Sequence, residues 1–329
     1  MIISRTPLRM SFAGGGSDLP SYYQEFGGAV LSAAINKYVY VNVNQKFDSG
    51  IRVGYSKNEE VAQVSQIEHP LVRNSLEYLN IPGGIEITTI ADIPSNGTGL
   101  GSSSTFTVGL LNALNAYLGN QPSADQLAQE ACHIEIGLCG EPIGKQDQYA
   151  AAYGGLNFIE FNPDGAVKVS PILCNQQTLR SLQEHLLVFY TGKTRSASSL
   201  LEQQSKEIAQ DELKKQSMHK MVQLARDLAV ELQANRVEAL GEILHEGWML
   251  KKSLVKGISE PEIDAWYERA LAAGAQGGKI LGAGAGGFLM LFASPERHVA
   301  IKQALSPLRP IPMGFDYAGT QIIFNEKIA

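Results

Sequence analysis

The stretch PSNGTGLGSSST at residues 94–105 decides the fold of this chain. Before it, Ile85 and Ile87 alternate with polar residues as in a strand, and after it Val108 and Leu111 recur at helical spacing. A loop of glycines and hydroxyls therefore joins a strand to a helix, and its three consecutive serines stand where N-cap residues are preferred. Because glycines expose backbone N–H groups and a helix N-terminus is positively polarised, the loop predicts an anion site, with phosphate as the expected anion.

Two better-known glycine loops do not match this chain. The GKT at 192–194 has Leu187 where a Walker A loop needs its first glycine. Segment 279–288, KILGAGAGGF, contains GxGxxG, but a buried-strand pattern follows it where a dinucleotide fold requires a helix. The chain has neither HRD nor DFG, so nothing supports a protein kinase. The phosphate loop at 94–105 therefore belongs to another class.

Three glycine-rich segments occur along the chain, and their combination is more specific than any one of them. They are PLRMSFAGGGSD at 7–18, the phosphate loop at 94–105 and KILGAGAGGF at 279–288. In order, spacing and content they resemble the GHMP kinase family, named for galactokinase, homoserine kinase, mevalonate kinase and phosphomevalonate kinase. The resemblance implies an ATP-dependent small-molecule kinase with a two-domain α+β fold. Its N-terminal domain would be like domain 2 of ribosomal protein S5, and its C-terminal domain would be a ferredoxin-like α/β sandwich with added helices.

The order of predicted elements fits two domains. Strands and glycine turns are expected over 1–60, a hairpin over 156–173, two strands near the end, and helices at 61–79, 102–118, 123–138, 196–234, 236–254 and 260–273. Near 175–185 the pattern changes to long helices with polar faces. We therefore predict an N-terminal ATP-binding domain at residues 1–178 and a C-terminal domain at residues 179–329.

Three further segments narrow the resemblance within the family. AGGGSDLPSYY at 13–23, AINKYVYV at 34–41 and GEPIGKQDQYAAAYGG at 140–155 are most similar to bacterial kinases of D-glycero-D-manno-heptose 7-phosphate. This similarity implies phosphorylation of the anomeric hydroxyl, giving the 1,7-bisphosphate for nucleotide-activated heptose synthesis. Fucokinase-type enzymes carry a related AGGx[ST]D element, so a kinase of an unphosphorylated sugar such as fucose or galactose stays open. A non-catalytic homologue that senses ATP and sugar is a second alternative.

Composition indicates a soluble cytoplasmic enzyme with a small-molecule substrate. The chain has 329 residues, 44% of them hydrophobic and 18% charged, as is usual for globular proteins. A net charge of −6 disfavours binding to nucleic acid, so a phosphorylated ligand must meet local cations. The three cysteines form no CxxC and indicate neither a disulfide framework nor a zinc site. No apolar run approaches a membrane span or a signal-peptide core, and the oligomeric state cannot be read from the sequence.

The resemblance implies catalytic roles for three residues. Asp147 lies in GKQDQY, and in the family this aspartate takes or orients the proton of the substrate hydroxyl. From the sequence alone, a turn or capping aspartate is the simpler interpretation. Arg9 would reach toward the transferring phosphoryl group or steady Asp147, and Lys145 or Arg9 would keep Asp147 ionised. Residues expected to bind ATP are Pro94, Gly97, Gly99, Leu100, Gly101, Ser102, Ser103 and Ser104.

Glu135 is a candidate metal ligand. It lies four residues after Ala131, partly on the apolar face of the helix predicted at 123–138, where a carboxylate is costly unless it is paired or binds a metal. The resemblance implies Mg²⁺ held by Glu135 and by Ser103, with Ser102 as the alternative hydroxyl. A salt bridge at the edge of the apolar face is the other interpretation.

The substrate site is expected around Asp18, which follows the glycines at 14–16 and would accept hydrogen bonds from two sugar hydroxyls. An Asx-type turn is the competing interpretation. A phosphorylated sugar needs cations, and TGKTRS at 191–196 offers two at a strand-to-helix junction, although a capping loop with solvated cations explains it equally well. Residues expected to bind substrate are Arg9, Gly14, Gly15, Gly16, Ser17, Asp18, Gly155, Lys193, Arg195, Gly284 and Gly286.

Overall fold

The computed structural model describes residues 1–94, 97–194 and 197–326, so Arg195 of the expected phosphate clamp lies outside the described residues. The strands are β1 (Ile2–Ala13), β2 (Gly28–Gln45), β3 (Ile51–Gly54), β4 (Asn58–Val61), β5 (Ile85–Ala91), β6 (Leu156–Phe161), β7 (Val167–Pro171), β8 (Leu186–Tyr190), β9 (Gly277–Ile280), β10 (Phe288–Phe292), β11 (Arg309–Pro310) and β12 (Gln321–Asn325). The helices are α1 (Pro20–Phe26), α2 (Pro70–Tyr78), α3 (Ser102–Tyr117), α4 (Ala124–Cys132), α5 (Gln146–Tyr153), α6 (Gln176–His185), α7 (Ala197–Gln210), α8 (Glu212–Gln233), α9 (Leu240–Leu254), α10 (Pro261–Ala272) and α11 (His298–Ala304).

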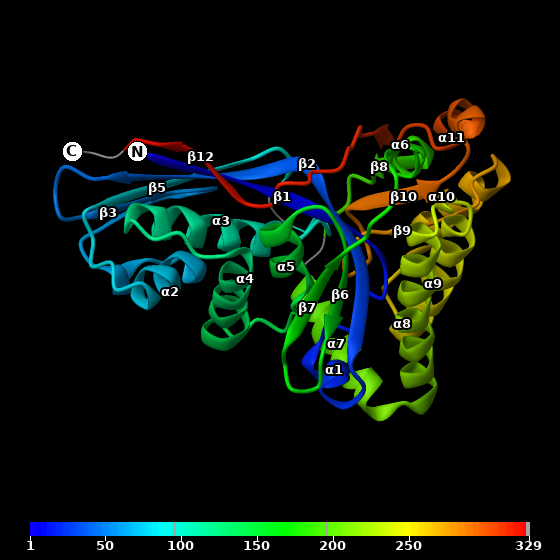
Figure 1. Cartoon of the computed structure of the whole chain (residues 1–329), viewed down its shortest axis with the longest axis horizontal. Coiled ribbons are helices and arrows are strands. Elements are labelled where there is room, and N and C mark those ends of the chain that lie inside the picture. Colours follow the sequence, from blue (N-terminus) through cyan, green and yellow to red (C-terminus); the bar gives the residue numbers. More distant parts are fainter. Residues whose placement is uncertain (95–96, 195–196, 327–329) are drawn as a thin grey trace.

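The first sheet carries the N-terminal half of the chain. Among the described residues its strands follow the order β12-β1-β2-β5-β3-β4, and β6 and β7 extend it along β2. Alternate residues Val39, Val41 and Val43 of β2 are buried, as the period of a half-buried strand requires. Figure 1 shows α2, α3 and α4 on one side of this sheet, and α3 contacts both β1 and β2. The predicted phosphate-loop helix is thus a central element of the core.

The second sheet lies at the other end of the molecule. In the described part of the chain its order is β11-β8-β10-β9, and β10 is buried along its whole length. Helices α8, α9 and α10 lie beside it (Figure 1). Helix α8 contacts both α9 and β2 and so joins the two halves of the molecule. None of the described helices combines the length and the apolar character that a membrane crossing requires.

The end of the chain returns to the first sheet, because β12 pairs antiparallel with β1. The second sheet begins with β8, shortly after the predicted boundary. The division into residues 1–178 and 179–329 stays a prediction, and the return of β12 means that the C-terminal segment completes the N-terminal sheet.

Several helix boundaries differ from the predicted ones for local reasons. The helix expected over 61–79 begins only at Pro70, since proline suits a first helical position and disfavours a helical residue before it. The helix expected over 196–234 is interrupted at Asp211, whose carboxylate caps α8 by accepting from the N–H groups of Leu213 and Lys214. The expected capping box of Ser123 and Gln126 is present in α4. Segment 146–153, for which no helix was expected, forms α5.

The third glycine segment packs directly on the phosphate loop. A Cβ on Gly282 would lie 2.3 Å from the Cα atom of Gly99, and one on Gly287 would lie 2.2 Å from the carbonyl oxygen of Thr98. These distances leave no room for any side chain, so the backbone of segment 279–288 is in direct contact with the backbone of the phosphate loop. Segment 279–288 therefore holds the phosphate loop in place from the C-terminal domain.

Substitution of Gly282 tests this contact. Gly282→Ala should lower the free energy of unfolding by about 1–3 kcal/mol more than Gly119→Ala, because overpacking adds to the strain of a positive φ. Gly119 is a matched control, since it has φ +85° against +78° for Gly282 and no atom within 4 Å of its added Cβ. Urea unfolding measures both variants, and the KM for ATP should rise only for Gly282→Ala. Equal losses in the two variants would contradict the packing argument.

Candidate active site

A cleft of about 560 Å³ lies where the glycine segments meet. The predicted site residues that line it come from the first glycine segment, the phosphate loop and the start of α5; they are Arg9, Gly15, Gly16, Asp18, Gly97, Gly99, Gly101, Ser102, Ser103, Ser104 and Asp147. Side chains that the sequence did not indicate also line it, among them Ser11, Gln146, Gln204, Lys251 and Lys279. The structure thus brings most of the expected ATP-binding and catalytic residues to one place.

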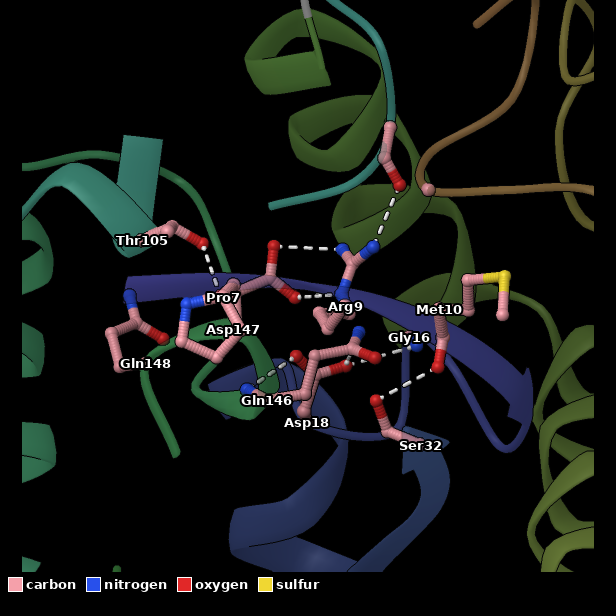
Figure 2. Close-up of polar contacts among 12 residues, drawn as sticks. Pro7, Arg9, Met10, Gly16, Asp18, Ser32, Thr105, Gln146, Asp147 and Gln148 are labelled. Atoms are coloured by element: carbon pink, nitrogen blue, oxygen red, sulfur yellow. Dashed lines mark hydrogen bonds and ion pairs between the residues drawn. The ribbon is translucent and has the colours of Figure 1, made fainter. Parts of the chain in front are cut away.

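The Arg9 guanidinium connects Asp147 to the phosphate loop. Its Nε and Nη2 atoms donate to the two carboxylate oxygens of Asp147 at 2.7 and 2.8 Å, and its Nη1 atom donates to the carbonyl of Gly99 at 2.7 Å (Figure 2). Such a bidentate pair fixes the position and the orientation of a carboxylate. Lys145 takes no part, because its ammonium donates to Gly165 O at 2.9 Å and lies over the Tyr23 ring, away from the cleft. Arg9 and Lys145 were the two expected partners of Asp147, and of these Arg9 alone contacts it.

Asp18 is buried at the edge of the cleft next to Asp147. Its carboxylate accepts from the backbone N–H of Gly16 at 3.0 Å and from the backbone and side-chain nitrogens of Gln146 at 3.2 and 3.1 Å. Gln146 directly precedes Asp147, so these bonds align the two carboxylates (Figure 2). Burial, and then the nearby charge of Asp147, raises the pKa of Asp18.

The N-terminus of α3 is open toward the cleft. The serines at 102–104 form the first turn, and Gly101 occupies the N-cap position in the left-handed conformation, where no side chain caps the helix. This corrects the expectation that the serines are the N-cap. A Cβ on Gly101 would lie 3.1 Å from Oδ2 of Asp147, so the loop and the carboxylate are in close contact. An anion bound by the first-turn N–H groups would therefore lie beside Asp147.

Glu135 lies behind Ser103, fully buried in a π-helical turn, His133–Leu138, that continues α4. It accepts hydrogen bonds from Ser103 Oγ at 2.8 Å and from Gln148 Nε2 at 2.6 Å, and burial raises its pKa to about 7. In the described part of the chain Glu135 has these two hydrogen bonds and no ion pair. A carboxylate and a hydroxyl beside a phosphate loop are the hard oxygen donors that suit Mg²⁺.

Other predicted substrate residues lie away from the cleft. Lys193 forms ion pairs with Glu260 at 2.9 Å and Glu262 at 2.6 Å, so its charge is neutralised outside the cleft lining. Three of the predicted glycines pack against other parts of the backbone: Gly14 against Ala29, Gly284 against Ile258 and Gly286 against Lys193. Ser17 donates a hydrogen bond to the carbonyl of Ala29. Gly155 forms backbone hydrogen bonds with Ala34 and Asp316. Pro94 is exposed and Leu100 is buried, and neither lines the cleft.

Two buried lysines were missed by the sequence analysis. Lys251 on α9 donates to the carbonyl of Gly282, and Lys279 on β9 donates to the carbonyl of Phe12 at 3.3 Å. Burial, reinforced by the charge of Arg9, lowers the pKa of Lys251 to about 8, and burial and the Lys251 charge lower the pKa of Lys279 well below its ordinary value. Lys251 lies three residues after Trp248 on the buried face of α9. A lysine at this helical spacing from apolar residues is the feature of the sequence that indicates its burial.

Lys251 should give the stability a measurable pH dependence. Between a folded pKa of about 8 and its ordinary value of 10.5, the unfolded chain holds the Lys251 proton more often than the folded chain, so stability rises with pH. Below pH 8 the lysine is charged in both states and the folded chain carries the whole cost of burial. The charged and titratable groups that face Lys251 are Arg9, Asp18, Asp147 and Lys279.

Lys251→Met should abolish this rise. Urea unfolding from pH 7 to 9.5 should show the wild type gaining stability relative to the variant. Lys252→Met is the control, because Lys252 faces Asp264 instead of the cleft and should keep the wild-type slope. A slope that Lys251→Met leaves unchanged would assign the titration to another group.

Known proteins show the same organisation. The chain matches the model of the GHMP kinases N terminal domain over residues 65–155 and that of the GHMP kinases C terminal over residues 228–307. It is 32% identical over 323 residues to the D-glycero-alpha-D-manno-heptose 7-phosphate kinase of Campylobacter jejuni, with 92% of this chain and 93% of that protein covered. The chain belongs to the GHMP kinase family. As a member it is a phosphotransferase acting on a hydroxyl group with ATP as phosphate donor.

Solved structures extend the comparison to the whole fold. The chain superposes on a D-glycero-D-manno-heptose 1-phosphate kinase from Bacteroides thetaiotaomicron with a TM-score of 0.82 and 28% identity, covering 99% of this chain and all of that one. Lactococcus lactis galactokinase, at 17% identity and a TM-score of 0.78 over 97% of this chain and 94% of that one, shares the fold. The predicted two-domain α+β GHMP kinase architecture is confirmed. The alternative of a non-catalytic sensor loses its support, because the family is one of enzymes.

Proposed function

We propose that this kinase transfers the γ-phosphoryl group of ATP to the anomeric hydroxyl of D-glycero-D-manno-heptose 7-phosphate, giving the 1,7-bisphosphate for nucleotide-activated heptose synthesis. Phosphoryl transfer is supported by one observation: the Arg9–Asp147 pair lies directly beside the open N-terminus of α3. The sugar class rests on two relatives whose names specify manno-heptose phosphates, although one name gives the 7-phosphate and the other the 1-phosphate. Because ATP is the donor, we place the reaction in the cytoplasm.

In this reaction the oxygen of the sugar hydroxyl forms a bond to the γ-phosphorus while the bond between that phosphorus and ADP breaks. Asp147 accepts the proton of the hydroxyl. Arg9 orients the Asp147 carboxylate through two hydrogen bonds, and the N–H groups at the start of α3 hold the phosphates. Asp18, fixed by Gln146, accepts hydrogen bonds from sugar hydroxyls. Ser103 and Glu135 would hold Mg²⁺, which supplies positive charge to the phosphates when bound.

A kinase of an unphosphorylated sugar is the competing proposal. It is favoured by the position of Lys193, which faces Glu260 and Glu262 instead of the cleft, and the described residues thus lack the expected clamp. A bifunctional fucokinase/GDP-fucose pyrophosphorylase of Arabidopsis thaliana is 28% identical over 91% of this chain, which spans only 30% of that protein.

A substrate panel separates the two proposals. Purified kinase with ATP and Mg²⁺ should be assayed for ADP release on heptose 7-phosphate, heptose 1-phosphate, the free heptose, fucose and galactose. We expect the highest kcat/KM on heptose 7-phosphate, with a product phosphorylated at the anomeric position. A higher kcat/KM on any unphosphorylated sugar would overturn the heptose phosphate proposal.

Asp147→Asn tests the assigned proton acceptor. An amide keeps the shape of the side chain but cannot take the proton, so kcat should fall by a factor on the order of 10²–10⁴. The dissociation constant for ATP should stay close to that of the wild type, as measured by calorimetry. Asp227→Asn on the exposed face of α8 serves as the matched control. Near-normal turnover in a folded Asp147→Asn variant would remove Asp147 from this role.

A further inference from the structure

Two lysines of the cleft, Lys251 and Lys279, form no ion pair among the described residues, although Lys251 lies within the electrostatic reach of Asp18 and Asp147. Both line the cleft, and only 5% and 6% of their surfaces are exposed. Each ammonium donates to a single backbone carbonyl, that of Gly282 or of Phe12. They differ in this from Lys252, the neighbour of Lys251, whose ammonium lies 3.0 Å from Asp264. The charge of Arg9, by contrast, is already matched by Asp147.

Neutral polar groups that line the same cleft also lack hydrogen-bond partners among the described residues. Ser11 Oγ and both amide atoms of Gln204 are buried, line the cleft, and have no hydrogen-bond partner in the part of the chain that the structure describes. Ser11 directly precedes Phe12, whose carbonyl accepts from Lys279. Gln204 packs against Gly16, since a Cβ there would lie 2.4 Å from its Nε2 atom. Unmet donors and uncompensated cations therefore occur on the same cleft.

This combination is unfavourable without a ligand. A buried cation with no counter-charge is costly, and two of them close together repel each other. A buried hydroxyl or amide without a partner adds a further cost. A neutral sugar hydroxyl would satisfy the hydrogen bonds but leave both charges uncompensated. A phosphate group meets both requirements, because it carries up to two negative charges on several acceptor oxygens.

We propose that Lys251, Lys279 and Ser11 form an anion subsite that holds a phosphate group of the reactants. The subsite occupies the wall of the cleft that α9 and β9 contribute, and it does not involve the segment 191–196. Two phosphates can enter the cleft, the one carried by the acceptor sugar and the γ-phosphoryl group of ATP. The first source rests on the proposed function, whereas the second requires only that the chain is a kinase.

The test uses Lys251→Met and Lys279→Met, which keep the length of the side chain and remove the charge, with Lys252→Met as the control on the same helix. A first measurement needs no sugar: inorganic phosphate is added to each protein and the rise in Tm is recorded. We expect a smaller rise for both cleft variants than for the wild type and for Lys252→Met. Without phosphate, the cleft variants should melt at or above the wild-type Tm, because an uncompensated buried charge is gone.

Steady-state kinetics then identify the source of the phosphate. If the subsite holds the acceptor phosphate, KM for heptose 7-phosphate should rise on the order of ten- to a hundredfold while KM for the free heptose and for ATP stays unchanged. If it holds the γ-phosphoryl group, kcat should fall equally on both sugars and ATP affinity should weaken. Either pattern supports the subsite. If the enzyme is not a heptose phosphate kinase, only the second pattern, an equal fall in kcat on both sugars, can be observed.

Three results would overturn the subsite. One is a phosphate-induced rise in Tm that is equal in the wild type and both cleft variants. Another is an effect of Lys252→Met as large as that of the cleft variants, which would indicate a general charge effect. The third is a Tm that falls in both cleft variants in the absence of phosphate, which would assign the lysines a structural role in binding the carbonyls of Gly282 and Phe12.

Discussion

The three hydrogen bonds of the Arg9 guanidinium are the interaction on which the active site depends. Arg9 lies on β1, Asp147 is in the first turn of α5, and Gly99 belongs to the phosphate loop, so one buried side chain joins three segments that are remote in sequence. Removal of the guanidinium would leave a carboxylate and a carbonyl unpartnered at a largely buried position, which is costly. The geometry that catalysis requires therefore forms only when the first sheet and α5 have packed together.

The phosphate loop is held from its other side by glycine contacts. Gly282 and Gly287 come from the segment that leads into β10 of the second sheet, and they lie against the backbone of Gly99 and Thr98. Since no side chain separates the two backbones, the loop has no rotamer changes through which to adjust. The glycines of the third segment are thus explained by lack of space, and they couple the position of the phosphate loop to the packing of the C-terminal domain.

The sequence predicted those parts of the site that local backbone structure creates. A glycine loop before a helix exposes N–H groups wherever the helix lies, so the sequence alone indicates Gly97, Gly99, Gly101 and the serines at 102–104, which line the cleft. Side chains are different, because their direction depends on distant partners. Lys193 looked like a phosphate ligand until the fold brought Glu260 and Glu262 against it, and Lys145 turned out to bind the carbonyl of Gly165.

Of the buried ionisable residues at the site, the sequence analysis indicated Glu135 but neither Lys251 nor Lys279. Glu135 lies near an apolar helix face in the sequence, and Lys251 in α9 stands in the same relation to the apolar residues of its helix. The two buried groups have complementary consequences. Glu135 adds negative charge behind Ser103, where a cation is expected, and Lys251 adds positive charge near Gly282, where a phosphate is expected. Because the Arg9 guanidinium is bound to Asp147, an entering phosphate would meet Lys251 and Lys279, which form no ion pair in the described part of the chain, without breaking the Arg9–Asp147 pair. The cleft thereby separates the lysines that can meet a phosphate from the arginine that positions Asp147.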